Sequence, residues 1–243
     1  MRFISPTTDF AFKRIFGSTE SREILISFLN SLIYAGKKEI EDLEILDPYS
    51  GGRVVYLKDS FLDVKAVLSN KKTVIIEMQL VNLGAFEKRV LYNLAKTYVN
   101  QLQTGAGYKN LQPVIALTIT NFQMFDESET IINHFVFQET QEKYEYKYRE
   151  LEMVFVELPK FNKSLEELTN ITDKWLYFLK NTSDLEFVPV SISDVSEIRQ
   201  ALNIAERANL QPEELDEVQN RELFIESYEG AIVRAKEEAL TEG

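Results

Sequence analysis

Apolar and polar residues alternate through positions 60–80, and this period of two predicts a β-hairpin. The even positions from 62 to 68 and from 74 to 80 are apolar, and the polar stretch SNKK at 69–72 supplies the turn. With the loop at 69–71, Asp63 is expected to lie directly opposite Glu77. Gln79 shares their face, because strand side chains repeat every second residue.

Two helices are expected before this hairpin. The segment 5–17 is a short amphipathic helix with Ser5 or Thr8 as its cap and Gly17 as its end. The segment 18–36 repeats apolar residues every three or four positions, which is typical of a helix that buries one face.

Both strands and a helix are expected around and after the hairpin. Short strands are expected within 41–48 and at 53–57, and a long amphipathic helix at 86–105. The nearly continuous apolar run 112–122 is typical of a buried strand, most easily placed parallel to an earlier one after a helical crossover. The order of elements predicts an α/β fold with a mixed β-sheet flanked by helices.

In the second half of the chain, extended structure is followed by helices and then by a charged segment. Further extended structure is expected at 136–161, then a helix that holds Trp175. Residues 195–240 are charged and rich in helix-forming residues. We therefore expect one domain at 1–190 and an acidic helical C-terminal extension at 191–243 that packs on the domain or on a partner.

Composition limits the chemistry. The chain has no cysteine, which excludes disulfides, thiolate zinc sites and cysteine nucleophiles, and its single histidine, His134, cannot form a histidine cluster. A bound metal would need oxygen ligands, which favours Mg²⁺, Mn²⁺ or Ca²⁺. The start lacks the apolar stretch of a signal peptide and no apolar run is long enough for a membrane span, so a cytoplasmic protein without membrane contact is expected.

The net charge of −12 at first argues against a nucleic-acid partner. Its distribution changes that interpretation, because residues 1–123 carry 15 basic and 12 acidic residues, whereas the remainder carries 12 basic and 27 acidic residues. A surface that faces a polyanion remains possible in the first half.

Two opposed carboxylates, Asp63 and Glu77, repel each other unless a cation lies between them. A hard divalent cation with oxygen ligands accounts for this pattern. The alternative is an amphipathic hairpin with a solvated face, on which Lys65 and Lys72 neutralise the acids. Spacing alone leaves both interpretations open.

The motif LDVKA, a turn, and IIEMQL resemble the metal-binding core of the PD-(D/E)XK nuclease superfamily, in the branch of PD-(D/E)XK nuclease family transposases. The resemblance extends to TTDFAFKRIFG before the hairpin and to LYNLAKTYVNQL and PVIALTITNF after it, over residues 5–180. It implies a restriction-endonuclease-like core and a metal-dependent DNA endonuclease associated with recombination or mobile elements.

The resemblance also assigns site residues. Asp63 and Glu77 match the acidic motif positions, and Gln79 stands where the superfamily name has lysine. It implies that Asp63, Glu77 and the Met78 carbonyl hold Mg²⁺, with Mn²⁺ as a substitute, for phosphodiester hydrolysis in which Gln79 orients water. The first motif lacks its proline, because Leu62 precedes Asp63.

Basic residues on two helices are candidate DNA contacts. Lys13 lies four residues after Asp9, so a surface ion pair is the alternative for it. On the helix after the hairpin, a solvated face is the alternative for Lys88, Arg89 and Lys96. DNA is the expected partner, and double-strand cutting would favour a homodimer.

Three further hypotheses remain. A non-catalytic module that keeps the nuclease fold could bind DNA or a protein partner, as Gln79 and the acidic second half favour. The acidic tail could also imitate nucleic acid and cover the basic half. Lys65, on the face of Asp63, could replace the missing lysine.

Overall fold

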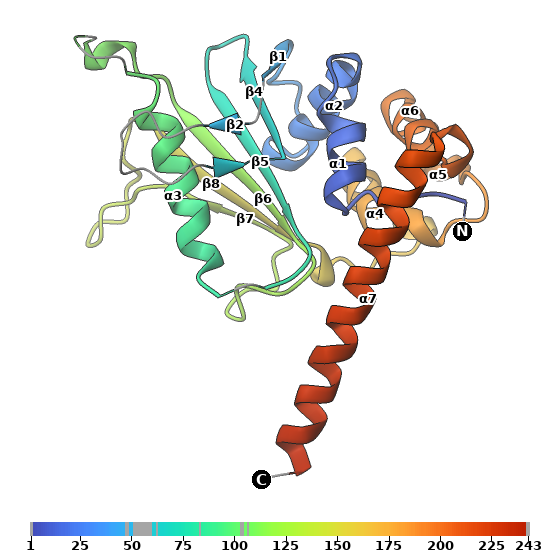
Figure 1. Cartoon of the computed structure of the whole chain (residues 1–243). Coiled ribbons are helices and arrows are strands. Elements are labelled where there is room, and N and C mark those ends of the chain that lie inside the picture. The colour runs from blue at the N-terminus through green and yellow to red at the C-terminus, as the bar shows by residue number, and fades with distance from the viewer. Residues whose placement is uncertain are drawn as a thin grey trace.

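Among the described residues, six strands form one sheet in the order β1-β4-β5-β6-β8-β7 (Figure 1). The structure, a computed structural model, describes residues 2–46, 49–50, 60–61, 63–82, 84–102, 105 and 107–241, without the side chains of 49–50, 60–61, 221, 228–229, 232–233 and 235–241. The strands are β1 Leu43–Leu46, β4 Val64–Leu68, β5 Thr73–Gln79, β6 Val114–Thr120, β7 Ile132–Phe135 and β8 Leu151–Glu157.

The sheet is mixed, as predicted. β5, β6 and β8 run parallel, whereas β1, β4 and β7 pair antiparallel with their neighbours. A separate ribbon pairs β2 (Tyr49–Ser50) with β3 (Ser60–Phe61). The strand predicted at 53–57 lies outside the described residues. Within the predicted extended segment 136–161, only β8 is a strand of the main sheet.

One face of the sheet is covered by α1, α2, α4, α5 and α6, which lie together on one side (Figure 1). Their bounds are α1 Asp9–Phe16, α2 Arg22–Ile33, α4 Ile171–Asn181, α5 Val190–Ser193 and α6 Ser196–Ala205. Short 3₁₀ helices lie at Thr19–Ser21, Tyr108–Asn110, Leu158–Lys160, Leu165–Glu167, Thr182–Asp184 and Arg207–Asn209. The apolar even positions of β4 and β5 pack into this layer.

Trp175 anchors the helical layer. Its ring lies 5.9 Å from that of Phe16 and 5.4 Å from that of Phe28, between centroids. Its indole Nε1 donates to Ser27 Oγ at 3.1 Å, so the one polar atom of the side chain is satisfied in the core. Thr8 caps α1, accepting from the Ala11 N–H, which decides between the two predicted caps.

The opposite face carries α3 (Phe86–Val99), which stands alone there among the labelled helices (Figure 1). Phe86, Val90 and Leu94 recur at helical spacing and are buried against Ile75, Val114, Ala116 and Phe155. The polar odd positions at the end of β5 therefore point towards α3, on the face opposite the large helical layer.

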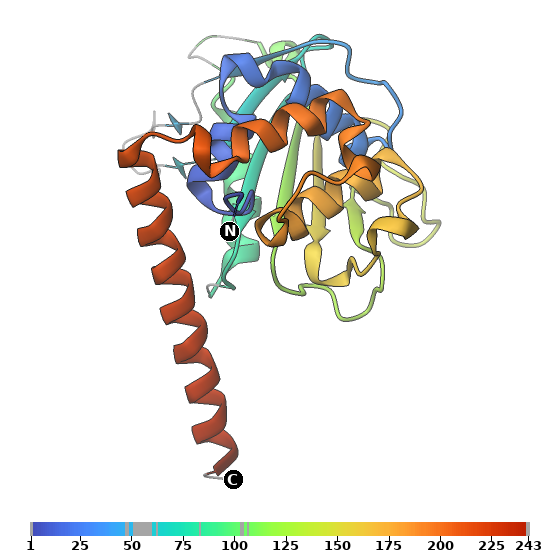
Figure 2. The same cartoon turned by 90° about the vertical axis from the view of Figure 1, so that its right-hand side faces the viewer.

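The chain beyond residue 190 lies partly inside the core. Ile198 and Leu202 of α6 are buried with the helical layer, and Ile4 N–H donates to Ala205 O at 2.9 Å. The last helix, α7 (Pro212–Thr241), begins against α1 and then extends away from the body (Figures 1 and 2). Ion pairs join Arg14 to Glu214 and Arg207 to Glu222.

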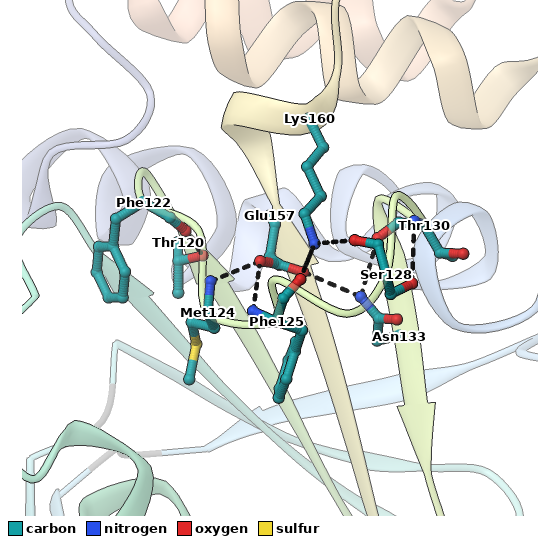
Figure 3. Close-up of polar contacts among 9 residues, drawn as sticks. All are labelled: Thr120, Phe122, Met124, Phe125, Ser128, Thr130, Asn133, Glu157 and Lys160. Carbon is teal, nitrogen blue, oxygen red and sulfur yellow. Dashed lines mark hydrogen bonds and ion pairs between the residues drawn. The ribbon is translucent and has the colours of Figure 1, made fainter.

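A buried ion pair closes the edge where β8 ends (Figure 3). Lys160 Nζ lies 2.7 Å from Glu157 Oε2 and also donates to the carbonyls of Phe125 and Ser128. The other oxygen of Glu157 accepts the N–H groups of Met124 and Phe125. All three ammonium protons and both carboxylate oxygens thus have partners, so this cluster fixes the loop after β6 rather than offering a ligand site.

In the part of the chain that the structure describes, no helix is long and apolar enough to cross a membrane.

Candidate functional site

The register of the β4–β5 hairpin is the predicted one. Val64 pairs with Ile76, and Val67 pairs with Thr73, across a turn in which Lys71 takes a positive φ of 69°. This register places Glu77 and Gln79 on the α3 face and Met78 on the face of the large helical layer.

Asp63 lies just before β4 and leaves the regular ladder. Its N–H donates to Ile76 O at 3.1 Å, and its Oδ2 accepts the Met78 N–H at 2.6 Å. The Met78 N–H faces the side of β4 at a point where β4 has ended, and the carboxylate satisfies it. In an extended strand the carbonyl lies on the same side as the N–H of its own residue, so the Met78 carbonyl faces the Asp63 side as well.

Helix α1 approaches Asp63 from the large helical layer. Asp9 lies beside the Asp63 carboxyl and raises its pKa. Lys13 Nζ lies 2.9 Å from Asp9 Oδ1 and 3.8 Å from Asp63 Oδ1. The predicted Asp9–Lys13 pair is thus present, but it belongs to a cluster with Asp63.

The Asp63 carboxyl is 11% exposed, and its environment favours the protonated form. Burial, and then the hydrogen bond with Asp9, raise its pKa to about 8 from an ordinary 3.8, whereas the Met78 N–H and Lys13 lower it. Asp9 and Asp63 influence each other's protonation, because two neighbouring carboxyls repel when both are charged.

Glu77 is 14% exposed and is held from the other face of the sheet. Arg89 Nη2 on α3 lies 2.6 Å from Glu77 Oε1, and Asn93 Nδ2 donates to Oε2 at 3.5 Å. Burial raises the pKa of Glu77 more than Arg89 and Asn93 lower it.

Gln79 is engaged at both ends of its amide. Its Nε2 donates to Val81 O at 2.7 Å, and its Oε1 accepts from Arg89 Nη2. Gln79, the next side chain after Glu77 on this face, therefore holds Arg89 in place.

A family model described as PD-(D/E)XK nuclease family transposase matches residues 6–232. The chain belongs to the PD-(D/E)XK nuclease family transposases. The mixed six-stranded sheet flanked by helices is consistent with the restriction-endonuclease-like α/β fold, as the sequence predicted. Membership makes the chain a nuclease-fold protein linked to mobile elements. Comparison with curated proteins and with solved structures found no match.

The sequence predicted Asp63, Glu77 and Gln79 on one face of the hairpin, and this was wrong for Asp63, because β4 begins only at Val64 and the site residues fall into two groups. Asp63 and the Met78 backbone lie with Asp9 and Lys13 on α1, whereas Glu77 and Gln79 lie with Arg89 on α3. The two groups adjoin, because Met78 follows Glu77 directly.

The candidate DNA contacts differ in access. Lys13 reaches the Asp63 carboxylate, and Lys88 is exposed on α3. Arg89 turns its guanidinium towards Glu77 and stays partly exposed to solvent. Lys96 is 4% exposed, with its ammonium over the Tyr92 ring, so we do not carry it forward as a DNA contact.

Two site neighbours were missed from the sequence. Asn93 follows Arg89 by four residues, so both lie on one face of α3, and that spacing is a signal that both reach the same target. The sequence predicts only a surface ion pair with Lys13 for Asp9. Its approach to Asp63 depends on how α1 docks, which spacing does not encode.

The family implies a divalent metal, and the donor set of this transposase-family chain fits one. Asp63 and Glu77 supply largely buried carboxylates with raised pKa, and the Met78 carbonyl directly follows Glu77 in β5. Hard cations such as Mg²⁺ and Mn²⁺ take such oxygen ligands and favour the charged carboxylates. Among the described residues there is no group of three or more acidic or histidine side chains that could hold a metal, so a site built from these residues relies on two carboxylates and backbone oxygen.

Proposed function

We propose that the protein is a metal-dependent DNA endonuclease that hydrolyses phosphodiester bonds in recombination or in the movement of mobile elements. The observation that carries the proposal is the pair of largely buried carboxylates near the end of β5: Asp63 accepts the Met78 N–H, and Glu77 directly precedes Met78. Two such acids in adjoining positions are typical of functional sites, and a bound cation would favour their charged forms.

The chain supplies ligands and charge for this reaction. Asp63, Glu77 and the Met78 carbonyl would hold Mg²⁺, with Mn²⁺ as a substitute. When bound, the ion supplies Lewis acidity, which lowers the pKa of water and stabilises the charge of the phosphoryl group. Lys13, beside Asp63, lies where a phosphate oxygen can be contacted.

DNA is the proposed partner because of family membership and the charge of the first half. Lys13 and Lys88 would contact phosphates, which carry affinity without sequence information. A homodimer would place two such sites on the two strands, and we propose a cytoplasmic location for the reaction.

The alternative is a non-catalytic nuclease-fold module that binds DNA or a protein partner. It is favoured by the engagement of Gln79 at both ends and by the pairing of Glu77 with Arg89. In that case the arginine would remain the permanent counter-charge of Glu77, and no metal would be needed.

Nicking of supercoiled plasmid separates the two functions. The parent chain is incubated with Mg²⁺ or Mn²⁺, with an EDTA control, beside Asp63→Asn and Glu77→Gln. Glu129→Gln is the matched control, because it removes one acidic charge from an exposed loop position. Each variant is checked for folding by its thermal unfolding.

Cleavage that requires metal, persists in Glu129→Gln and disappears in both site variants is the expected result. The loss should be at least about 100-fold, the scale seen when one transition-state contact is removed. Full cleavage by a folded Asp63→Asn chain would overturn the proposed function. A folded parent that binds DNA but never nicks it would establish the non-catalytic alternative.

A further inference from the structure

Arg89 lies on α3, but its guanidinium is held against the end of β5. Its Nη2 contacts Glu77 Oε1 at 2.6 Å and donates to Gln79 Oε1, and its guanidinium carbon lies 5.0 Å from the centroid of the Phe86 ring. Three contacts from two elements therefore hold one cation at the site. The side chain is still 41% exposed, so it also faces solvent.

Gln79 is the reason why a positive side chain at this site has to come from a helix and not from β5. The superfamily pattern has lysine at this position, and a glutamine there supplies no charge. Its Nε2 is committed to Val81 O, so its Oε1 points to Arg89 as an acceptor. Gln79 thus acts on Arg89 as a positioning residue, and the positive charge lost from β5 is restored from α3.

The hydrogen-bonding capacity of Arg89 is not exhausted. Its buried Nε has no hydrogen-bond partner among the described residues. Guanidinium groups stay protonated at every relevant pH, and their planar donors match phosphate oxygens two at a time. An arginine cannot deprotonate water as a base, so the role open to it is binding of the negatively charged phosphate.

We propose that Arg89 is a further catalytic residue, a phosphate-binding guanidinium that replaces the missing lysine and that a divalent cation displaces from Glu77. This inference rests on the proposed function. When Glu77 turns to a metal, Arg89 keeps Gln79 and the Phe86 ring as anchors and is free to contact a non-bridging phosphate oxygen. Glu77 therefore has two competing cations, one from α3 and one from solution.

Because Arg89 and the metal would compete for Glu77, Arg89→Met should strengthen metal binding and slow cleavage. Without the competing guanidinium, Mn²⁺ should bind at least about five-fold more tightly in the absence of DNA, the low end of usual coupling between sites. Cleavage by the same variant should be about 100-fold slower or more, because a phosphate contact is lost. A merely structural arginine would not improve metal binding when removed.

The experiment measures Mn²⁺ affinity by calorimetric titration without DNA, and plasmid nicking at saturating Mn²⁺. Arg89→Lys is the second variant, because it keeps a charge near Gln79 and should recover part of the cleavage. Lys109→Met is the control for the loss of one positive charge, since Lys109 is exposed and far along the chain from the site residues. Thermal unfolding confirms that each chain is folded.

The outcomes separate this inference from the function on which it rests. Weaker or unchanged Mn²⁺ binding by folded Arg89→Met, or cleavage at the parent rate, overturns the role of Arg89 alone. A parent chain that neither binds Mn²⁺ nor cleaves overturns the proposed function itself. Tighter metal binding with slower cleavage, partly recovered in Arg89→Lys, supports the inference.

Discussion

The Met78 N–H donates to Asp63 Oδ2 at 2.6 Å, so the candidate metal ligand also completes the hydrogen bonding of β5. An alanine at position 63 would remove both the carboxylate and the acceptor for a strand N–H. Asparagine keeps an acceptor oxygen, so Asp63→Asn separates chemistry from folding.

Asp63→Asn should stabilise the metal-free protein at pH 8. The native pKa of about 8 lies above the ordinary 3.8, so the native state binds more protons and the free energy of unfolding falls as pH rises between these values. Asparagine does not titrate, so the variant lacks this loss. The free energy of unfolding at pH 8 should rise by about 1 kcal/mol or more. For a chain of this size each kcal/mol raises the melting temperature by roughly 2–4 °C, which thermal unfolding from pH 5 to pH 8 measures. A variant that is less stable than the parent at pH 8 would contradict the prediction.

Added Mn²⁺ should raise the melting temperature more at pH 8 than at pH 5.5. Protons compete with the cation for the Asp9–Asp63 pair, whose pKa is raised. At a hundredfold excess over the dissociation constant, binding adds about 2.7 kcal/mol to the free energy of unfolding. EDTA should reverse the shift, and Glu77→Gln should diminish it. An equal shift at both pH values would show that the cation binds elsewhere.

Lys160→Met should destabilise the protein by about 3–5 kcal/mol, because it leaves the buried Glu157 carboxylate unpaired. Urea unfolding measures the loss, and faster hydrogen exchange at the Met124 and Phe125 amides would locate it. The double variant with Glu157→Gln should recover part of the stability. Glu127→Gln, exposed on the same loop, is the control and should have little effect.

Deletion of 227–243 should leave the body folded, since the ion pair of Glu222 with Arg207 and the buried Val218 are retained. We also expect unchanged DNA affinity, because α7 extends away from the sheet instead of covering it (Figure 2). A filter-binding assay over a range of salt concentrations measures the affinity.

A tighter and more salt-dependent complex after this deletion would support the hypothesis that the acidic tail covers the basic half. The longer deletion 195–243 is not a fair test, because it removes Ile198 and Leu202 from the core and should unfold the chain.

The sequence was sufficient for the hairpin register, because one buried face fixes the pairing of Val64 with Ile76 and a slip of one residue would expose it. It was also sufficient for the mixed sheet, since helical and strand periods alternate in order. The departure of Asp63 from the ladder was not predictable, because it depends on where β4 ends.

The orientation of Arg89 was not predictable for a different reason. A charged residue on an amphipathic helix normally lies in solvent, and only the docking of α3 over β5 brings it to Glu77. The Glu157–Lys160 pair joins a strand to the turn after it, but its burial depends on a loop from elsewhere in the chain.

The pairing of the N-terminal segment with residues beyond α6 affects how the protein can be synthesised. Ile4 N–H donates to Ala205 O, and Arg207 N–H donates to Arg2 O, so residues 2–4 bond to residues about 200 positions later in the chain. Domains usually begin folding while the chain is still emerging. Here the segment at residues 2–4 has to wait until about 200 further residues have been translated, so this part of the core closes long after its first strand has been made.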